Sequence, residues 1–181
     1  MTVLILHGIQ GYAGIHWQKW LNDQLTAEGH KVMMPNLPNA EHPDRSEWLQ
    51  AVKGVIANCD LSELVIVGHS LSVVTALDFI EQSPASIKAL ISVSGFSKDY
   101  NAELNSYFLK EKEINFEKAK KNLKKAIVIY GDNDPYVPQE ILKLLADKLK
   151  VKPIIIKNGG HLNTDAGFTT LPVLLVVING L

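Results

Sequence analysis

The chain has 181 residues, of which 46% are hydrophobic, and its 18 basic and 19 acidic side chains leave a net charge of −1. This length and composition are typical of one folded domain and exclude a disordered chain. The near-neutral charge argues against nucleic acid and anionic membrane surfaces as partners. The one local excess of lysines, in residues 110–125, we interpret as a solvated helical surface.

The chain contains a single cysteine, Cys59, so no intramolecular disulfide can form and no cysteine-based metal site is indicated. Residues 1–7 lack the basic start of a signal peptide and are typical of a strand. The longest apolar run, 171–178, is interrupted by Pro172 and is too short to span a membrane. We therefore expect a cytoplasmic protein without membrane contact.

Short apolar runs alternate with longer amphipathic segments along the chain. The predicted strands are Val3–Leu6, Lys31–Met34, Leu64–Val67, Ala89–Val93, Ala126–Tyr130 and Pro153–Ile156. The predicted helices are Trp17–Glu28, Ser46–Asn58 with Ser46 near its N-cap, Leu71–Gln82, Gln139–Leu149 and Leu171–Ile178. Continuously apolar strands separated by helices indicate an α/β fold, in which a mainly parallel sheet is covered on both faces.

The loop after the first strand begins with His7 and Gly8 and has further glycines at positions 11 and 14. Spaced glycines also suit a phosphate-binding loop. However, this spacing is not G-x-G-x-x-G, and no acidic residue ends the second strand, so we exclude a dinucleotide site. The backbone N–H groups of such a loop can instead hold the oxyanion of an acyl-transfer reaction. We assign one oxyanion donor to the N–H group of Ile9.

The segment Gly68-His69-Ser70-Leu71-Ser72 lies between a predicted strand and a predicted helix, and it resembles the nucleophile elbow G-x-S-x-G. Ser70 is therefore a candidate nucleophile, although a serine at this place can also be an ordinary helix cap. The helix N-terminus favours negative charge, and we assign the second oxyanion donor to the N–H group of Leu71. Ser72 replaces the usual final glycine. We expect it to make the packing of the elbow less tolerant without abolishing the chemistry.

Residues 96–122 separate two predicted strands by more than a simple helical connection needs. They carry aromatic side chains and follow the end of a strand, where ligand sites of parallel sheets lie. We interpret them as a small lid or a substrate-lining insert, and plain surface helices are the alternative.

A serine nucleophile needs a base and an acid that orients the base, and these follow the serine in the order acid, then histidine, in strand–elbow–helix hydrolases. Asp132 and Asp134 lie in a turn after the fifth predicted strand, and either could be a turn former. We favour Asp134 as the acid, because it lies three residues after the strand-end glycine and ahead of a helix. His161 follows the last predicted strand and is the candidate base.

Together these segments resemble the α/β-hydrolase superfamily, and within it the small serine hydrolases of the retinoblastoma-binding protein 9 and YdeN type. The resemblance lies in "HGIQGYAGIHWQKWL" after the first strand, the elbow "GHSLS", the stretch "INFEKAKKNLKKAIVIYGDNDPYVP" and the late "GGHLN". It implies Ser70, Asp134 and His161 as the catalytic triad, in agreement with the assignment from strand ends. It also implies a minimal hydrolase fold without a large cap and a six-stranded sheet in the order 2-1-3-4-5-6.

The expected function is that of a serine hydrolase, a carboxylesterase-like enzyme that cleaves small acyl esters or amides without a cofactor or metal. Its expected partner is a small-molecule acyl substrate. The alternative is a hydrolase-fold binding module with an unproductive triad, because the family's name itself records a protein partner. The intact set of Ser70, Asp134 and His161 argues against this alternative.

Overall fold

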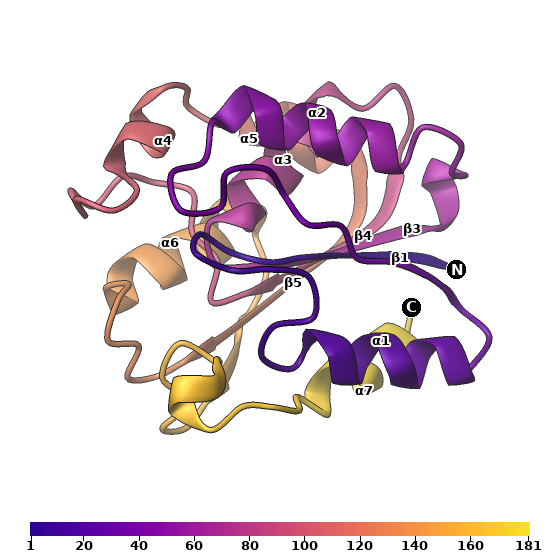
Figure 1. Ribbon diagram of the computed structural model, residues 1–181. Helices are drawn as coiled ribbons and strands as arrows, with labels where there is room; N and C mark the ends of the chain where they lie inside the picture. The colour runs from indigo at the N-terminus through magenta and orange to yellow at the C-terminus, as the bar shows by residue number, and fades with distance from the viewer.

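Six parallel strands form the centre of the computed structural model, which describes all of residues 1–181 (Figure 1). The strands are β1 (Thr2–Leu6), β2 (Lys31–Met33), β3 (Leu64–His69), β4 (Ile87–Val93), β5 (Leu123–Gly131) and β6 (Ile154–Ile156). Each pair of neighbours is parallel, and the order across the sheet is β2-β1-β3-β4-β5-β6. The predicted sheet and its strand order are confirmed.

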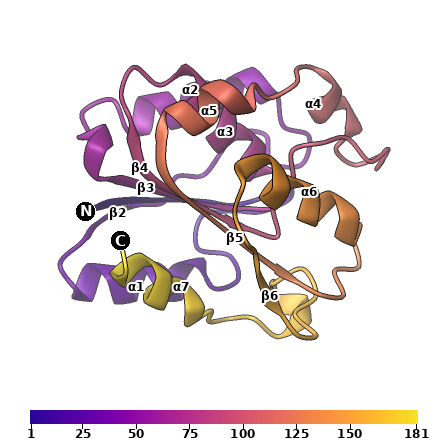
Figure 2. The ribbon, with the colours of Figure 1, turned by 180° about the vertical axis from the view of Figure 1, so that it is seen from behind.

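Helices cover both faces of this sheet, as the two opposite views show (Figures 1 and 2). One face carries α1 (Gln18–Ala27) and α7 (Val173–Asn179). The other face carries α2 (Arg45–Val55), α3 (Ser72–Gln82), α5 (Phe116–Lys121) and α6 (Gln139–Leu149). A short helix, α4 (Ser106–Lys110), and the 3₁₀ helices Leu61–Glu63 and Thr164–Ala166 complete the fold. The protein is a three-layer α/β/α sandwich, as predicted, and has no large cap.

The central strands are apolar throughout because both of their faces are covered. Every residue of β3 is buried, and successive side chains point to opposite faces of the sheet. Leu64 and Ile66 belong to the core under α2 and α3, whereas Val65 and Val67 belong to the core under α1 and α7. This two-sided burial explains why these strands show a continuous apolar run instead of an alternating pattern.

The N-terminus of α2 differs from the prediction. Asp44, not Ser46, is the N-cap residue, because its backbone is extended and its side chain accepts a hydrogen bond from the Glu47 N–H at 2.9 Å. The Ser46 hydroxyl donates to the Asp44 carboxylate instead, at 2.6 Å. The helix therefore begins at Arg45, which places that side chain on the first turn.

The segment 96–122 has two parts. Its second half forms α5, which packs in the same helical layer as α3 through the buried Ala119. Its first half contains α4 and lies at the edge of the sheet where the strands have their carboxyl ends (Figure 1). None of the helices combines the length and apolarity that crossing a bilayer requires.

Candidate active site

A cleft of about 660 Å³ opens at the carboxyl edge of the sheet. Loops that follow five of the strands contribute to it, through Gly8, Ser70, Tyr100, Tyr136, His161 and neighbouring residues. The connections from β1 and β3 run to opposite faces of the sheet, which is the arrangement that opens a binding crevice in parallel sheets. The predicted serine, histidine and glycine-rich loop thus line one cleft.

Ser70 stands on a strained turn between β3 and α3. Its φ angle is +57°, in the left-handed region that L side chains rarely adopt. Its N–H group donates to the carbonyl oxygen of Val93 at 2.9 Å, which holds the turn against the end of β4. Leu71 is the N-cap residue of α3, and no side chain caps this helix. Ser70 therefore does not act as a helix cap, and that alternative is wrong.

The loop after β1 approaches Ser70 closely at Gly8. A Cβ atom at Gly8 would lie 3.0 Å from the Ser70 Cβ and 3.2 Å from the His69 carbonyl oxygen, so a side chain there would push the loop away. The His7 ring fixes the loop: its Nε2 accepts from the Leu37 N–H at 2.9 Å, so its Nδ1 carries the proton and donates to the Gly8 carbonyl at 2.8 Å. Ile9 follows Gly8 directly in the chain.

The N–H groups of Ile9 and Leu71 donate to no other group of the protein. Ile9 lines the cleft, and Leu71 follows Ser70 directly at the N-terminus of α3. Backbone N–H groups left without a partner beside a strained serine are available to an oxygen atom of a bound molecule. The two predicted donors thus come from loops that meet at Ser70.

His161 and Asp134 form a close pair. The distance from His161 Nδ1 to Asp134 Oδ2 is 2.7 Å, and the Asp134 side chain is fully buried. Because the carboxylate accepts at Nδ1, the neutral imidazole carries its proton there and leaves Nε2 as the basic nitrogen. The second oxygen of Asp134 accepts from the N–H groups of Tyr136 and Val137, at 2.9 and 3.1 Å. The Asp134 carboxylate thus stabilises the turn that follows it and also binds the ring of His161.

Asp132 has a different place. Its side chain accepts from the Asn158 N–H at 2.7 Å and is exposed. Asp132 therefore joins the loops after β5 and β6 at the surface and makes no hydrogen bond to His161.

Three aromatic nitrogen atoms hold the loop that carries His161. The ring of His69, one residue before the elbow serine, donates from Nε2 to the His161 carbonyl at 3.0 Å. The indole N–H of Trp17 donates to the Leu162 carbonyl at 2.9 Å, and His16 Nδ1 accepts from the Thr164 N–H at 3.1 Å. The backbone they hold is strained, since Leu162 has a φ angle of +50°.

Burial keeps these supporting histidines neutral. It lowers the pKa of His69 to well below its usual range, and the neighbouring His161 lowers it further. Burial likewise lowers the pKa of His7 and of His16. A neutral ring offers one donor and one acceptor, which is what His7 uses in its two hydrogen bonds.

Ser72 is buried and hydrogen-bonded. Its hydroxyl oxygen accepts from the His69 N–H at 3.1 Å, and its proton can reach the carbonyl oxygens of Leu6 and His69, at 3.1 and 2.9 Å. Gly68 packs against Val73 at the start of α3. The hydroxyl thus bonds the end of β3 to the end of β1 and takes part in holding the elbow.

The chain matches the family described as serine hydrolase over residues 3–179. It belongs to this family. Its relatives include the Bacillus subtilis protein YdeN, which is 29% identical over 97% of this chain and 93% of its own length. The serine hydrolase RBBP9 of Rattus norvegicus is 27% identical over 80% of this chain and 77% of its own length.

The fold of this serine hydrolase matches solved structures. The crystal structure of YdeN superposes with a TM-score of 0.90 at 28% identity, over 99% of this chain and 97% of that one. A carboxylesterase structure from Nitrososphaera gargenis gives a TM-score of 0.72 at 11% identity, over 99% of this chain and 88% of that one, a likeness of fold alone. The protein is a small α/β-hydrolase of the YdeN and RBBP9 type.

Sequence reasoning missed several residues of the site. It assigned no role to His16 or Trp17, yet both hold the loop of His161. It also missed Tyr136, whose ring stands perpendicular to that of His161 at 5.2 Å. The adjacent pair His16-Trp17 was one available signal, because a buried indole needs an acceptor for its N–H group. No three His, Cys, Asp or Glu side chains of this serine hydrolase are grouped to hold a metal ion.

The structure predicts that Ser72→Gly destabilises this serine hydrolase and does not raise its activity. The substitution leaves the buried N–H group of His69 without its partner and adds backbone freedom, so the free energy of unfolding should fall by about 1–3 kcal/mol. Urea denaturation measures this change. Ser72→Ala is the matched control: it should show most of the loss if the hydroxyl matters, and wild-type stability of that variant would contradict the assignment.

Proposed function

We propose that this serine hydrolase cleaves small acyl esters or amides through an acyl-enzyme on Ser70. The Ser70 Oγ attacks the acyl carbonyl carbon while His161 Nε2 takes the hydroxyl proton. The tetrahedral intermediate then expels the alcohol or amine, which takes that proton from His161. A water molecule, deprotonated by the same nitrogen, attacks the acyl group and releases the acid, and Ser70 regains its proton. This chemistry needs no metal or cofactor.

The pairing of His161 with Asp134, in the same cleft as a strained serine, carries this proposal. The 2.7 Å contact places the proton of the neutral ring on Nδ1, which leaves Nε2 as the acceptor nitrogen, and it would stabilise the imidazolium that forms during attack. Asp134 remains the proposed acid, because Asp132 accepts from Asn158 at the surface instead. The alternative function, a binding module with an unproductive triad, gives no reason for the left-handed backbone of Ser70.

The free N–H groups of Ile9 and Leu71 are the proposed oxyanion hole. Donors fixed before the reaction stabilise the charge that develops on the carbonyl oxygen, and two backbone amides are the usual set. The position of Leu71 at the N-terminus of α3 adds a favourable helix dipole.

The lining of the cleft supports a neutral substrate of modest size. Its apolar walls come from Ile9 and Ile15 on one side and from Leu104 and Val137 among the later loops. The cleft is lined by no lysine or arginine, and its two carboxylates, Glu103 and Asp165, are exposed. Such a cleft disfavours esters with a carboxylate or phosphate group.

Ser70→Ala tests the nucleophile. The variant should lose turnover of p-nitrophenyl acetate by at least about a thousandfold and should not react with a fluorophosphonate probe. Release of p-nitrophenol and labelling on a gel measure the two properties. Folded wild-type protein that does not react with the fluorophosphonate probe would contradict the proposal.

The acid assignment is tested by comparing Asp134→Asn with Asp132→Asn. Loss of the carboxylate at 134 removes the partner that fixes the proton on His161 Nδ1, so kcat should fall by about a hundredfold or more. The same change at 132 alters an exposed loop contact and should leave kcat within about threefold of wild type. Steady-state kinetics with p-nitrophenyl acetate measure both, and the reverse ranking would overturn the choice.

A further inference from the structure

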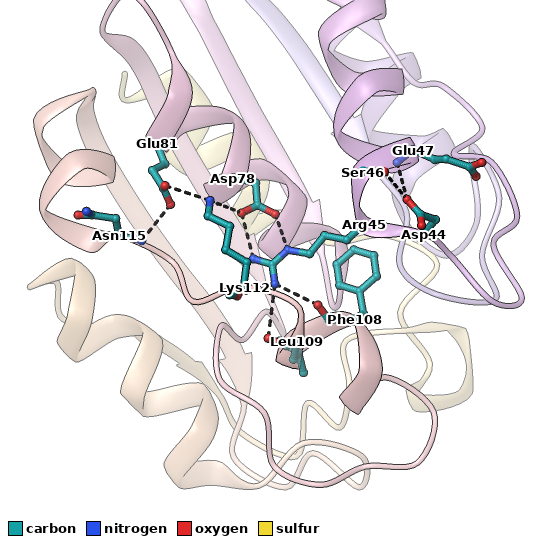
Figure 3. A network of polar contacts seen from close by, with 10 residues as sticks. All are labelled: Asp44, Arg45, Ser46, Glu47, Asp78, Glu81, Phe108, Leu109, Lys112 and Asn115. Atoms are coloured by element: carbon teal, nitrogen blue, oxygen red, sulfur yellow. Dashed lines mark hydrogen bonds and ion pairs between the residues drawn. The ribbon is translucent and has the colours of Figure 1, made fainter.

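Arg45 is the only arginine in the chain, and its side chain is buried on the first turn of α2 (Figure 3). Its Nε and Nη2 groups donate to the two carboxylate oxygens of Asp78 on α3, at 2.7 and 3.0 Å. Its Nη1 group donates to the carbonyl oxygens of Phe108 and Lys112, at 3.0 and 2.7 Å. The planar guanidinium has five N–H donors, so it can bind a carboxylate and backbone carbonyls together. Arg45 therefore joins α2 and α3 to the segment that contains α4.

The second cation of this cluster, Lys112, lies at its rim. Its Nζ is 3.2 Å from the Asp78 carboxylate and 3.0 Å from that of Glu81, and its side chain is 41% exposed. The side chains of Arg45 and Asp78, in contrast, are 4% and 3% exposed. Figure 3 shows Arg45 between Asp78 and the carbonyl groups of the α4 segment. Arg45, not Lys112, is thus the side chain that bridges the helices.

The helix α4, which Arg45 contacts, is too short to be stable by itself. α4 spans five residues, fewer than an isolated helix needs for stability. The carbonyl groups of its last turn have no partners within the helix, and Arg45 supplies one for Phe108. The Phe108 ring is fully buried, 5.6 Å from the ring of Trp48 on α2. α4 therefore contacts α2 through the Arg45 guanidinium and the Trp48 ring, and Asp99 binds its other side through Ser106 and Lys110.

The residues directly before α4 form one wall of the cleft. Tyr100, Leu104 and Asn105 all line it, and Asn105 is the N-cap residue of α4. The Asn105 side chain donates to the Tyr100 hydroxyl at 3.0 Å, which makes residues 100–105 a connected unit. A shift of α4 would therefore move this wall relative to Ser70, which stands on a different loop.

We infer that Arg45 is a positioning residue that sets the place of the wall 100–105 and so determines which substrates the cleft accommodates. It does this through the carbonyl groups of the α4 segment and lies outside the cleft lining. The inference rests on the proposed function, because a wall can select a substrate only if the cleft is the active site. A short ester that leaves the wall untouched should be insensitive to Arg45, whereas a longer one that reaches the wall should not.

The test compares Arg45→Lys with Lys112→Met. Lysine keeps the charge beside Asp78 but cannot bind a carboxylate and two carbonyl groups at once. Steady-state kinetics are measured with p-nitrophenyl acetate, with p-nitrophenyl hexanoate and with hexyl acetate, which extend the acyl and the alcohol side. For Arg45→Lys, the KM of at least one longer ester should rise about tenfold, while kcat for p-nitrophenyl acetate stays within about twofold. Lys112→Met should match wild type with all three esters.

Two kinetic outcomes overturn the inference: equal losses on short and long esters, and an unchanged KM for both long esters. Amide hydrogen exchange gives a readout that does not depend on turnover, and residues 100–113 should exchange faster in Arg45→Lys while β3 and α3 do not. Wild-type exchange in that segment would overturn the anchoring. If the wild-type protein hydrolyses none of the esters, the proposed function is overturned, and the proposed selection of substrates by the wall is overturned with it. Hydrogen exchange would then test only whether Arg45 anchors the α4 segment. If Arg45→Lys does not fold, Asp78→Asn weakens the hold on the same guanidinium and takes its place.

Discussion

The left-handed backbone of Ser70 is the constraint on which the rest of the site depends. A non-glycine residue in this region costs about 1–3 kcal/mol, so neighbouring contacts must hold it. The Ser70 N–H group bonds to the end of β4, and the buried hydroxyl of Ser72 bonds the ends of β3 and β1. Gly8 lets the first loop come within contact of the serine. The order β1-β3-β4 across the sheet thus brings three strand ends together at one strained residue.

The proposed nucleophile and base share their support. His69 precedes Ser70 in the chain, and its ring donates to the backbone carbonyl of His161. The elbow therefore directly holds the loop that carries His161. Trp17 and His16, which directly precede α1, hold the next residues of that loop. The bond that His16 accepts needs a neutral imidazole, and burial lowers the pKa of His16 in the direction that keeps it neutral. Burial lowers the pKa of His69 in the same direction. The geometry around His161 therefore depends on segments more than 90 residues away in the chain.

Much of this arrangement could be predicted because parallel strands all end at one edge of the sheet. Ser70, Asp134 and His161 each follow a predicted strand, and that alone predicts that they lie near one another. The supports could not be predicted, because they join side chains to backbone groups across long separations: Trp17 reaches Leu162. The carbonyl groups that Arg45 binds belong to an irregular segment without a periodic pattern. Asp78 was the remaining signal there, a lone charge within the apolar run of α3.

An acyl-enzyme on Ser70 is tested most directly by identifying the atom that carries the acyl group during turnover. Wild-type protein mixed with p-nitrophenyl acetate, quenched in acid within the first turnovers and digested, should yield an acetylated peptide whose modified residue is Ser70. Mass spectrometry locates the acetyl group, and the adduct should accumulate when deacylation is slower than acylation. Turnover with the acetyl group on another side chain, or with Ser70 unmodified while its alanine variant stays active, would contradict an acyl-enzyme on Ser70.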